Sequence, residues 1–182
     1  MVGVEDGGFS READVQEAML VSVLLDGTSI IDFRMHKIEV DGLDATKKLL
    51  TMVGCWLFDS VMLAGVSFAG FNLIDANTVF AEFKKPVIVI SRTKPNNASV
   101  KRALLKHFDD WEARWRVIER LGPVYEVASV SAESPIYAEI VGADLNWASN
   151  LIRRLCSCCR IPEPIRVAGL IARGLTRRVW RS

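Results

Sequence analysis

The sequence predicts an α/β protein in which a mixed β-sheet carries helices on both faces. Two short apolar runs, residues 60–64 and 87–91, have the length and composition of buried strands. A helical pattern separates them, which favours parallel pairing within one sheet. Ahead of them, Asp26-Gly27 stands between two extended segments and is a strong hairpin signal. Parallel strands beside an antiparallel hairpin make the sheet mixed.

Composition sets the class of protein. The chain has 182 residues, half of them hydrophobic and a quarter charged, which predicts one domain over residues 1–182 and excludes disordered or collagen-like chains. Four cysteines are too few for a secreted disulfide scaffold. Residues 52–74 are long enough to span a bilayer, but Asp59 near their middle argues for a buried helix and strand instead. We expect a cytoplasmic protein with no membrane partner.

The first part of the chain predicts mostly strands. Val2-Gly3-Val4 is a short apolar strand that runs into an acidic turn, and residues 17–25 and 29–40 form the hairpin. Apolar residues alternate in the second hairpin strand, so one of its faces is mostly apolar. Asp44 is a good N-cap type for a helix over residues 44–57.

The later part alternates helices and strands. Lys84-Lys85-Pro86 breaks one helix, Asn96-Asn97 starts another, and Pro162-Glu163-Pro164 separates the last two. In order, we expect a strand at 60–64, a close-approach loop at 65–72, a helix at 74–83, a strand at 87–91, helices at about 96–108 and 109–121, strands at 124–130 and 136–141, and helices at 144–159 and 164–178.

This order of elements is that of the RNase H-like nucleases. Such folds place carboxylates on the first strand and at the end of a central strand, where they hold a divalent metal for phosphodiester chemistry. We therefore expect the strand of Val2 to Val4 to lie centrally, next to residues 60–64.

Five sequence blocks carry a family resemblance. The sequence resembles an archaeal family of unknown function that is related to endonuclease V, and the resemblance spans nearly the whole chain. It implies an RNase H-like, endonuclease V-like fold. The blocks are VGVEDGGF (2–9), VDGLDAT (40–46), VMLAGVSFAGFN (61–72), VIVISRTKP (87–95) and PEPIRVAGLIA (162–172).

The resemblance also implies a site with several substitutions. Endonuclease V is a Mg-dependent nuclease that cuts near deaminated bases. Glu5 stands where it has its first Asp, and Asp44 lies near its helix-start carboxylate. Ala64 replaces an Asp and Gly169 replaces a His. The resemblance thus implies a degenerate centre, with catalysis less expected than binding. Glu5, Asp6 and Asp44 would allow a residual Mg²⁺ site, and the alternative is a capped turn followed by a helix N-cap, where carboxylates are favoured in any case.

Charge is unevenly distributed, although the net charge is only +1. Residues 1–44 hold 10 acids and 3 bases, whereas residues 151–182 hold 8 Arg and one acid. Arginine binds phosphate through its planar fork, so this end predicts DNA or RNA as a partner. Pairing of the two ends or simple solvation is the alternative. The candidate nucleic-acid-binding residues are Arg92, Lys94, Arg166, Arg173 and Arg177.

Two other groups of residues each allow two interpretations. Cys156, Cys158 and Cys159 lack the paired spacing of a zinc site, which favours ordinary packing of thiols. Trp111 and Trp115 stand one helical turn apart beside arginines. They would suit base stacking, but anchoring of the helix is the preferred interpretation.

The leading hypothesis is a nucleic-acid-associated protein with a degenerate nuclease centre. One alternative is an active Mg-dependent endonuclease that uses Glu5, Asp6 and Asp44. A second is a protein-interaction module whose arginines meet an acidic partner. The sequence leaves a homo-oligomer open.

Overall fold

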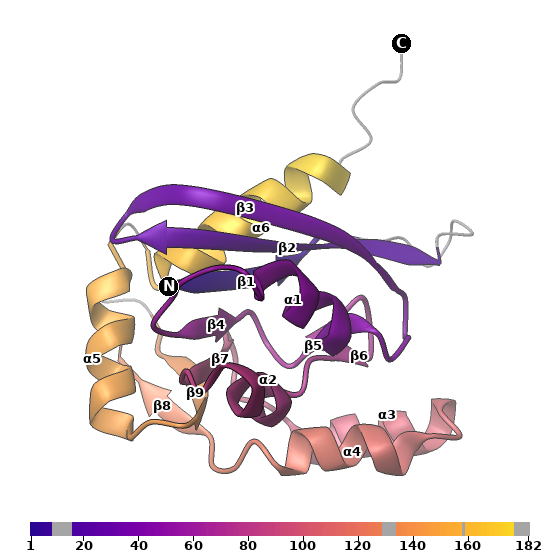
Figure 1. Cartoon of the computed structure of the whole chain (residues 1–182). Coiled ribbons are helices and arrows are strands. Elements are labelled where there is room, and N and C mark those ends of the chain that lie inside the picture. The colour runs from indigo at the N-terminus through magenta and orange to yellow at the C-terminus, as the bar shows by residue number, and fades with distance from the viewer. Residues whose placement is uncertain (9–15, 129–133, 158, 177–182) are drawn as a thin grey trace.

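The computed structural model describes residues 1–8, 16–128, 134–157 and 159–176. A seven-stranded mixed sheet runs through the molecule, with helices on both of its faces (Figure 1). This is the α/β class that the sequence predicts. The strands are β1 (Val2–Asp6), β2 (Glu17–Asp26), β3 (Ser29–Glu39), β4 (Val61–Leu63), β7 (Val87–Ser91), β8 (Tyr125–Val127) and β9 (Ile136–Val141), with β5 (Ser67–Phe68) and β6 (Asn72–Leu73) in a separate hairpin.

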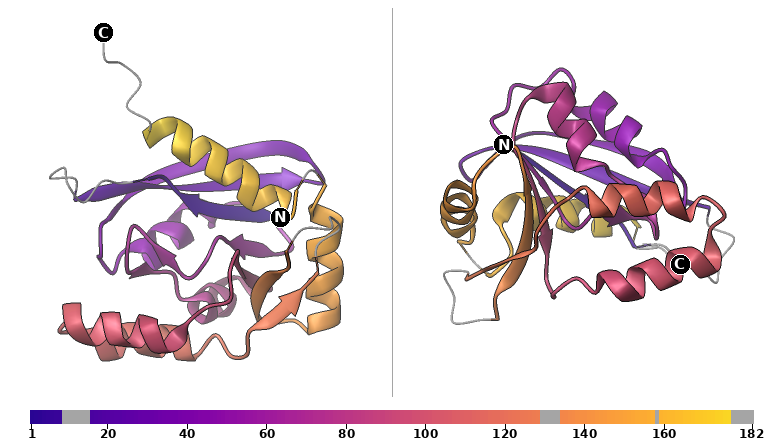
Figure 2. Two further views of the ribbon diagram at one scale, coloured as in Figure 1. Left: turned by 180° about the vertical axis from the view of Figure 1, so that it is seen from behind. Right: turned by 90° about the horizontal axis from the view of Figure 1, so that it is seen from below.

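The helices are α1 (Ala45–Val53), α2 (Ala76–Phe83), α3 (Asn97–His107), α4 (Trp111–Glu119), α5 (Leu145–Leu155) and α6 (Glu163–Thr176). Buried side chains of α1 and α2 share one apolar cluster with the sheet, and those of α5 and α6 pack against it in two others. Figure 2 shows α6 crossing the sheet on the face opposite α1.

The order of strands is β3-β2-β1-β4-β7-β9-β8. Strands β1, β4 and β7 are parallel neighbours, while β2 and β3 form the antiparallel hairpin predicted at Asp26-Gly27. Val2 lies beside Val61 and Val4 beside Leu63. The prediction that β1 is central and next to β4 is therefore confirmed.

Alternation along β1 decides what meets each face of the sheet. Val2 and Val4 point into the cluster formed with α1 and α2. Gly3 and Gly7 face α6, and a Cβ built on Gly3 would lie 2.3 Å from the backbone of Pro164. On Gly7 it would lie 2.3 Å from Cγ2 of Thr176. Glycine at these positions lets the last described helix pack directly on the first strand.

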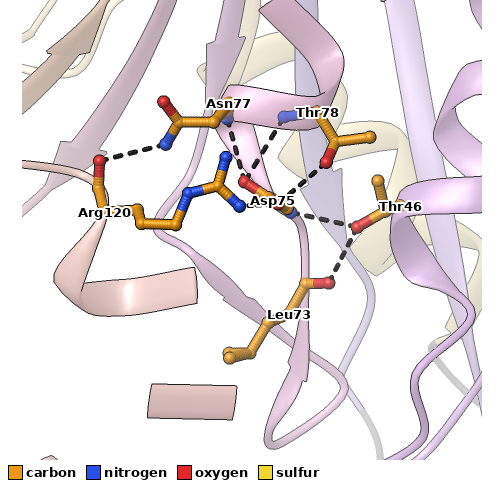
Figure 3. Close-up of polar contacts among 6 residues, drawn as sticks. All are labelled: Thr46, Leu73, Asp75, Asn77, Thr78 and Arg120. Atoms are coloured by element: carbon orange, nitrogen blue, oxygen red, sulfur yellow. Dashed lines mark hydrogen bonds and ion pairs between the residues drawn. The ribbon is translucent and has the colours of Figure 1, made fainter. Parts of the chain in front are cut away.

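Helix α2 begins at a polar junction that joins three elements (Figure 3). The Asp75 carboxylate accepts hydrogen bonds from the first backbone N–H groups of α2, which is a standard N-cap. It also pairs with Arg120, at 3.4 Å, just past α4. On the other side, the hydroxyl of Thr46 in α1 accepts from the N–H of Asp75. The junction fixes α1, α2 and the end of α4 relative to one another.

Several element boundaries differ from the sequence prediction. Helix α1 ends at Val53, not at residue 57, and Leu57 is 95% exposed. Asp44 occupies the N-cap position of α1, but its side chain makes no capping bond. The expected loop at 65–72 contains most of the β5–β6 hairpin. Helix α5 ends at Leu155, before residue 159.

Residues 52–74 form the end of α1, strand β4 and the β5–β6 hairpin. Among the described residues, no helix is both long and apolar enough to cross a membrane.

Candidate functional site

A cavity of about 650 Å³ opens at the edge of the sheet where β1, β4 and β7 end. Parallel strands bring their carboxyl ends to one edge, so residues that directly follow three different strands meet there. The polar and charged side chains around the cavity belong to Glu5, Asp6, Ser91, Arg92, Thr93 and Arg173. Ala64 and Gly65 complete the wall after β4.

Glu5 and Asp6 are the acidic pair of this cavity. Burial raises the pKa of Glu5 to about 7, and the negative charge of Asp6 adds to the rise, while Arg92 and Arg173 oppose it. Burial also raises the pKa of Asp6, against the stabilising hydrogen bond that its Oδ2 accepts from the N–H of Ala69 at 2.6 Å. A nearby cation would therefore stabilise the charged form of both carboxyl groups.

Arg173 reaches this pair across a glycine. A Cβ built on Gly169, one helical turn earlier in α6, would lie 2.8 Å from Nη1 of Arg173 and 3.2 Å from Cγ of Glu5. The guanidinium therefore lies in the space that a side chain at position 169 would need. Gly169 leaves the space between α6 and β1 open to the cation of Arg173.

The third predicted carboxylate does not join the first two. Asp44 is not part of the cavity wall, and its Oδ1 accepts from Nδ2 of Asn72 at 2.6 Å and from the N–H of Glu39 at 3.2 Å. Ala64 lies at the cavity but brings no oxygen except its backbone carbonyl. Among the described residues, no group of three or more His, Cys, Asp or Glu side chains is placed to hold a metal ion.

The predicted nucleic-acid-binding residues occupy different environments. Arg92 and Arg173 line the cavity and are exposed, and Lys94 is exposed nearby in sequence but is not part of the wall. Arg166 donates to both carboxylate oxygens of Glu163, at 2.7 and 2.5 Å. Arg177 lies outside the described residues.

Sequence reasoning missed the residues that hold the β5–β6 hairpin beside Asp6. Ala69 and Asp41 both have positive φ, 43° and 57°, and the N–H of Asp41 donates to the carbonyl of Ala69. Arg114 is 5% exposed and donates to the carbonyls of Asp41 and Phe71. The one sequence signal for Arg114 was its place in an amphipathic helix. That signal could not identify its partners, because the carbonyls that it binds lie far away in sequence.

In the described part of the chain, the tryptophan pair and the cysteine group have packing roles. Trp111 and Trp115 pack with Leu73, Leu104 and Ile118, so they anchor α4. Cys156 is buried and its thiol donates to the carbonyl of Arg160. Cys158 lies outside the described residues.

Comparisons by sequence agree on one family. The family model for Endonuclease dU matches residues 1–176. The UPF0215 protein of Pyrococcus furiosus is 31% identical over 182 residues, covering 97% of this chain and 92% of its own. The UPF0215 protein of Methanothermobacter thermautotrophicus is 34% identical over 181 residues, covering 97% and 87%. The expected resemblance to an archaeal family is confirmed.

Comparisons by structure agree on the fold. A crystal structure of a protein of unknown function from Archaeoglobus fulgidus has a TM-score of 0.86 and 28% identity, covering 97% of this chain and 98% of that one. Endonuclease V from Ciona intestinalis, in complex with a 24mer DNA containing an inosine, has a TM-score of 0.63 and 14% identity, covering 98% and 86%. The fold is endonuclease V-like and RNase H-like, as predicted.

Proposed function

The chain belongs to the Endonuclease dU family, and from that premise we propose that it is a metal-dependent endonuclease acting on DNA that contains deoxyuridine. The family name supplies the nucleotide. One observation carries the proposal: Glu5, Asp6, Arg92 and Arg173 line one cavity at the carboxyl edge of the sheet. We also propose that residues 1–182 work as a single domain, because α6 closes directly on β1.

The pair of carboxyl groups fits Mg²⁺. This ion keeps several waters and binds through one or two carboxylates plus substrate phosphates, so two protein ligands suffice. Glu5 and Asp6 would hold it, since both line the cavity and Asp6 uses only one oxygen for Ala69. When bound, Mg²⁺ polarises a phosphoryl oxygen and lowers the pKa of a bound water.

The two arginines supply the other half of the chemistry. Guanidinium groups donate two parallel hydrogen bonds to phosphate, which suits the backbone of a nucleic acid. Arg92 follows β7 and Arg173 comes from α6, so a phosphate between them would be held from two sides of the cavity. Both lie close enough to Glu5 to lower its pKa, so the phosphate would be bound beside the acidic pair.

A second candidate function is binding of nucleic acid without cleavage. Two observations favour it. Ala64, which follows β4 in the cavity wall, has no carboxylate, and Asp44 lies outside the cavity, bonded to Asn72. In this case the same cavity would hold the backbone through Arg92 and Arg173 but would leave it intact.

Cleavage of short oligonucleotides separates the two functions. The full chain is incubated with Mg²⁺ and single- or double-stranded DNA carrying one deoxyuridine, one deoxyinosine or neither. We expect cutting that depends on deoxyuridine and Mg²⁺ and is lost in Glu5→Gln and Asp6→Asn. Asp44→Asn is the matched control, because it keeps the Oδ1 acceptor outside the cavity.

The same variants are then tested for binding by fluorescence anisotropy. Binding by wild type without cleavage of any of the three DNAs would reject the endonuclease and favour the second candidate. Equal cutting by wild type and Glu5→Gln would show that the proposed site is wrong.

A further inference from the structure

Strand β3 exposes an apolar row at the outer edge of the sheet. Phe33 and Met35, which pair with Val23 and Val21 of β2, are 46% and 49% exposed, and Ile31, at the bulge where β3 shifts register against β2, is 60% exposed. Figure 1 shows β3 as the outermost strand, and among the described residues β2 is the strand that pairs with it. Natural sheets usually protect such an edge, so a long apolar edge strand indicates a surface that another chain covers.

The backbone of this edge is also open to pairing. The N–H of Phe33 donates to its neighbour's Oδ1, on Asp32, at 2.8 Å, and the N–H of Glu39 donates to Asp44. These bonds show that the odd-numbered residues of β3 from Phe33 to Glu39, past the bulge at Ile31, present their backbone groups away from β2, because bonded and non-bonded positions alternate in antiparallel strands. By this alternation, Met35 and Lys37 also present N–H and C=O groups at the edge.

We propose that a second copy of this chain pairs with β3 in an antiparallel arrangement, with the two-fold axis at Phe33. In this register Phe33 lies opposite itself, and Met35 lies opposite the bulged residue Ile31 of the other copy. Phe33 and Met35 of the two copies then adjoin on the face that carries α6, because their partners Val23 and Val21 cluster with α6. In the dimer, the N–H of Phe33 donates its hydrogen bond to the carbonyl of Phe33 in the second copy instead of to Oδ1 of Asp32.

Charge complementarity selects this register. A two-fold axis at Phe33 sets Asp32 opposite Arg34 twice, on the other face of the strand, and opposite charges in that position stabilise a pair of strands. A two-fold axis at Arg34 would place Arg34 opposite Arg34 of the other copy. An axis at Met35 would place Arg34 opposite His36. Neither register pairs opposite charges at Arg34. Asp32 and Arg34 already lie 3.6 Å apart within one chain, so the pairing extends an existing group of charges.

The two-fold arrangement makes the interface isologous, which is the commonest geometry of homodimers. It joins two seven-stranded sheets edge to edge and leaves both cavities open, because β3 lies two strands away from β1. The inference is independent of the proposed nuclease activity.

The mass of the protein in solution gives the first test. Light scattering across a dilution series should give twice 20.3 kDa at the higher concentrations. Phe33→Lys puts two like charges on the axis and should give the monomer mass. Leu105→Lys is the matched control, because Leu105 is an exposed leucine on α3 and should leave the dimer intact. A wild-type monomer throughout, or equal effects of both variants, would overturn the proposal.

Cross-linking tests the register. In a Cys55→Ser background, Phe33→Cys should form an intermolecular disulfide, since directly opposed residues lie within about 5.5 Å between Cα atoms. Met35→Cys should not, because its copies would stand four residues apart, or roughly 13 Å. Mass spectrometry locates the bond. A dimer that cross-links through Met35→Cys and not through Phe33→Cys would overturn the two-fold axis at Phe33.

Discussion

Gly169 and Arg173 share one space in the site, because a Cβ on Gly169 would lie 2.8 Å from Nη1 of Arg173. The contacted atom is the far end of a flexible side chain. A larger residue at position 169 would therefore displace the guanidinium from Glu5 and leave the helix itself in place.

Gly169→Ala should weaken DNA binding to about the level of Arg173→Ala without loss of stability. Gly174→Ala is the matched control, because it lies on the same helix with open space around its Cα. It should gain about 1 kcal/mol in free energy of unfolding from helix propensity and should leave binding unchanged. Anisotropy titrations and urea unfolding measure both. Tight binding by Gly169→Ala would show that Arg173 does not need its present position.

Arg173→Ala should reduce the salt dependence of binding to duplex DNA. Each lost phosphate contact lowers the slope of log K against log salt by about 0.9. Arg166→Ala should leave this slope unchanged and instead cost about 1–3 kcal/mol of stability, since it removes two hydrogen bonds to Glu163. If Arg166→Ala lowered the slope and Arg173→Ala did not, the phosphate contact would lie at the start of α6.

Glu139→Gln should change stability in a pH-dependent way. Glu139 is 5% exposed, and burial raises its pKa from 4.5 to about 7. The folded state therefore holds this proton more tightly than the unfolded state. The contribution to stability is present below pH 4.5 and is lost as pH rises through 7, by about 3 kcal/mol at most.

Urea unfolding at pH 5 and pH 8 measures this effect. The variant should be more stable than wild type at pH 8 and similar to it at pH 5. Glu126→Gln serves as control, because Glu126 is exposed on the neighbouring strand β8. Identical pH dependence in wild type and Glu139→Gln would contradict the prediction.

Arg114→Lys should cost about 2–4 kcal/mol, because lysine cannot reproduce the fork of a buried guanidinium. Arg114 donates to three carbonyls and to Oδ1 of Asp110 at 2.8 Å. Arg116→Lys, two residues later in α4, should change stability by less than about 0.5 kcal/mol, since Arg116 is 72% exposed. Thermal unfolding compares the two variants, and equal midpoints would mean that the buried contacts contribute little.

Local signals predicted the order of elements well. The Asp26-Gly27 hairpin and the Asn96 cap of α3 depend on neighbouring residues, and both are found where the sequence indicated them. Glu5 lies in the same cavity as Ala64 and Gly65, the residues after β4. This could be predicted because the carboxyl ends of parallel strands share one edge of the sheet.

Features that depend on distant partners could not be predicted in this way. Asp44 has the composition of an N-cap, but Asn72 competes for its carboxylate. The apolar row of β3 has the alternation of a buried strand, although it lies beyond the cover of α6 and is exposed. The burial of Arg114 could not be predicted in full, because three of its acceptors are backbone carbonyls far away in sequence, which no side-chain pattern reveals.

The close packing of Gly3 and Gly7 against α6 has a consequence for synthesis of the chain. Glu5 leaves the ribosome long before Arg173, its neighbour in the site, because the two residues lie far apart in the sequence. The acidic pair therefore has no cationic partner from α6 until α6 itself has been synthesised. Contacts between such distant residues form slowly, so the cavity should be completed only after α6 has left the ribosome. A nascent chain would be unable to use this site on nucleic acid in its surroundings.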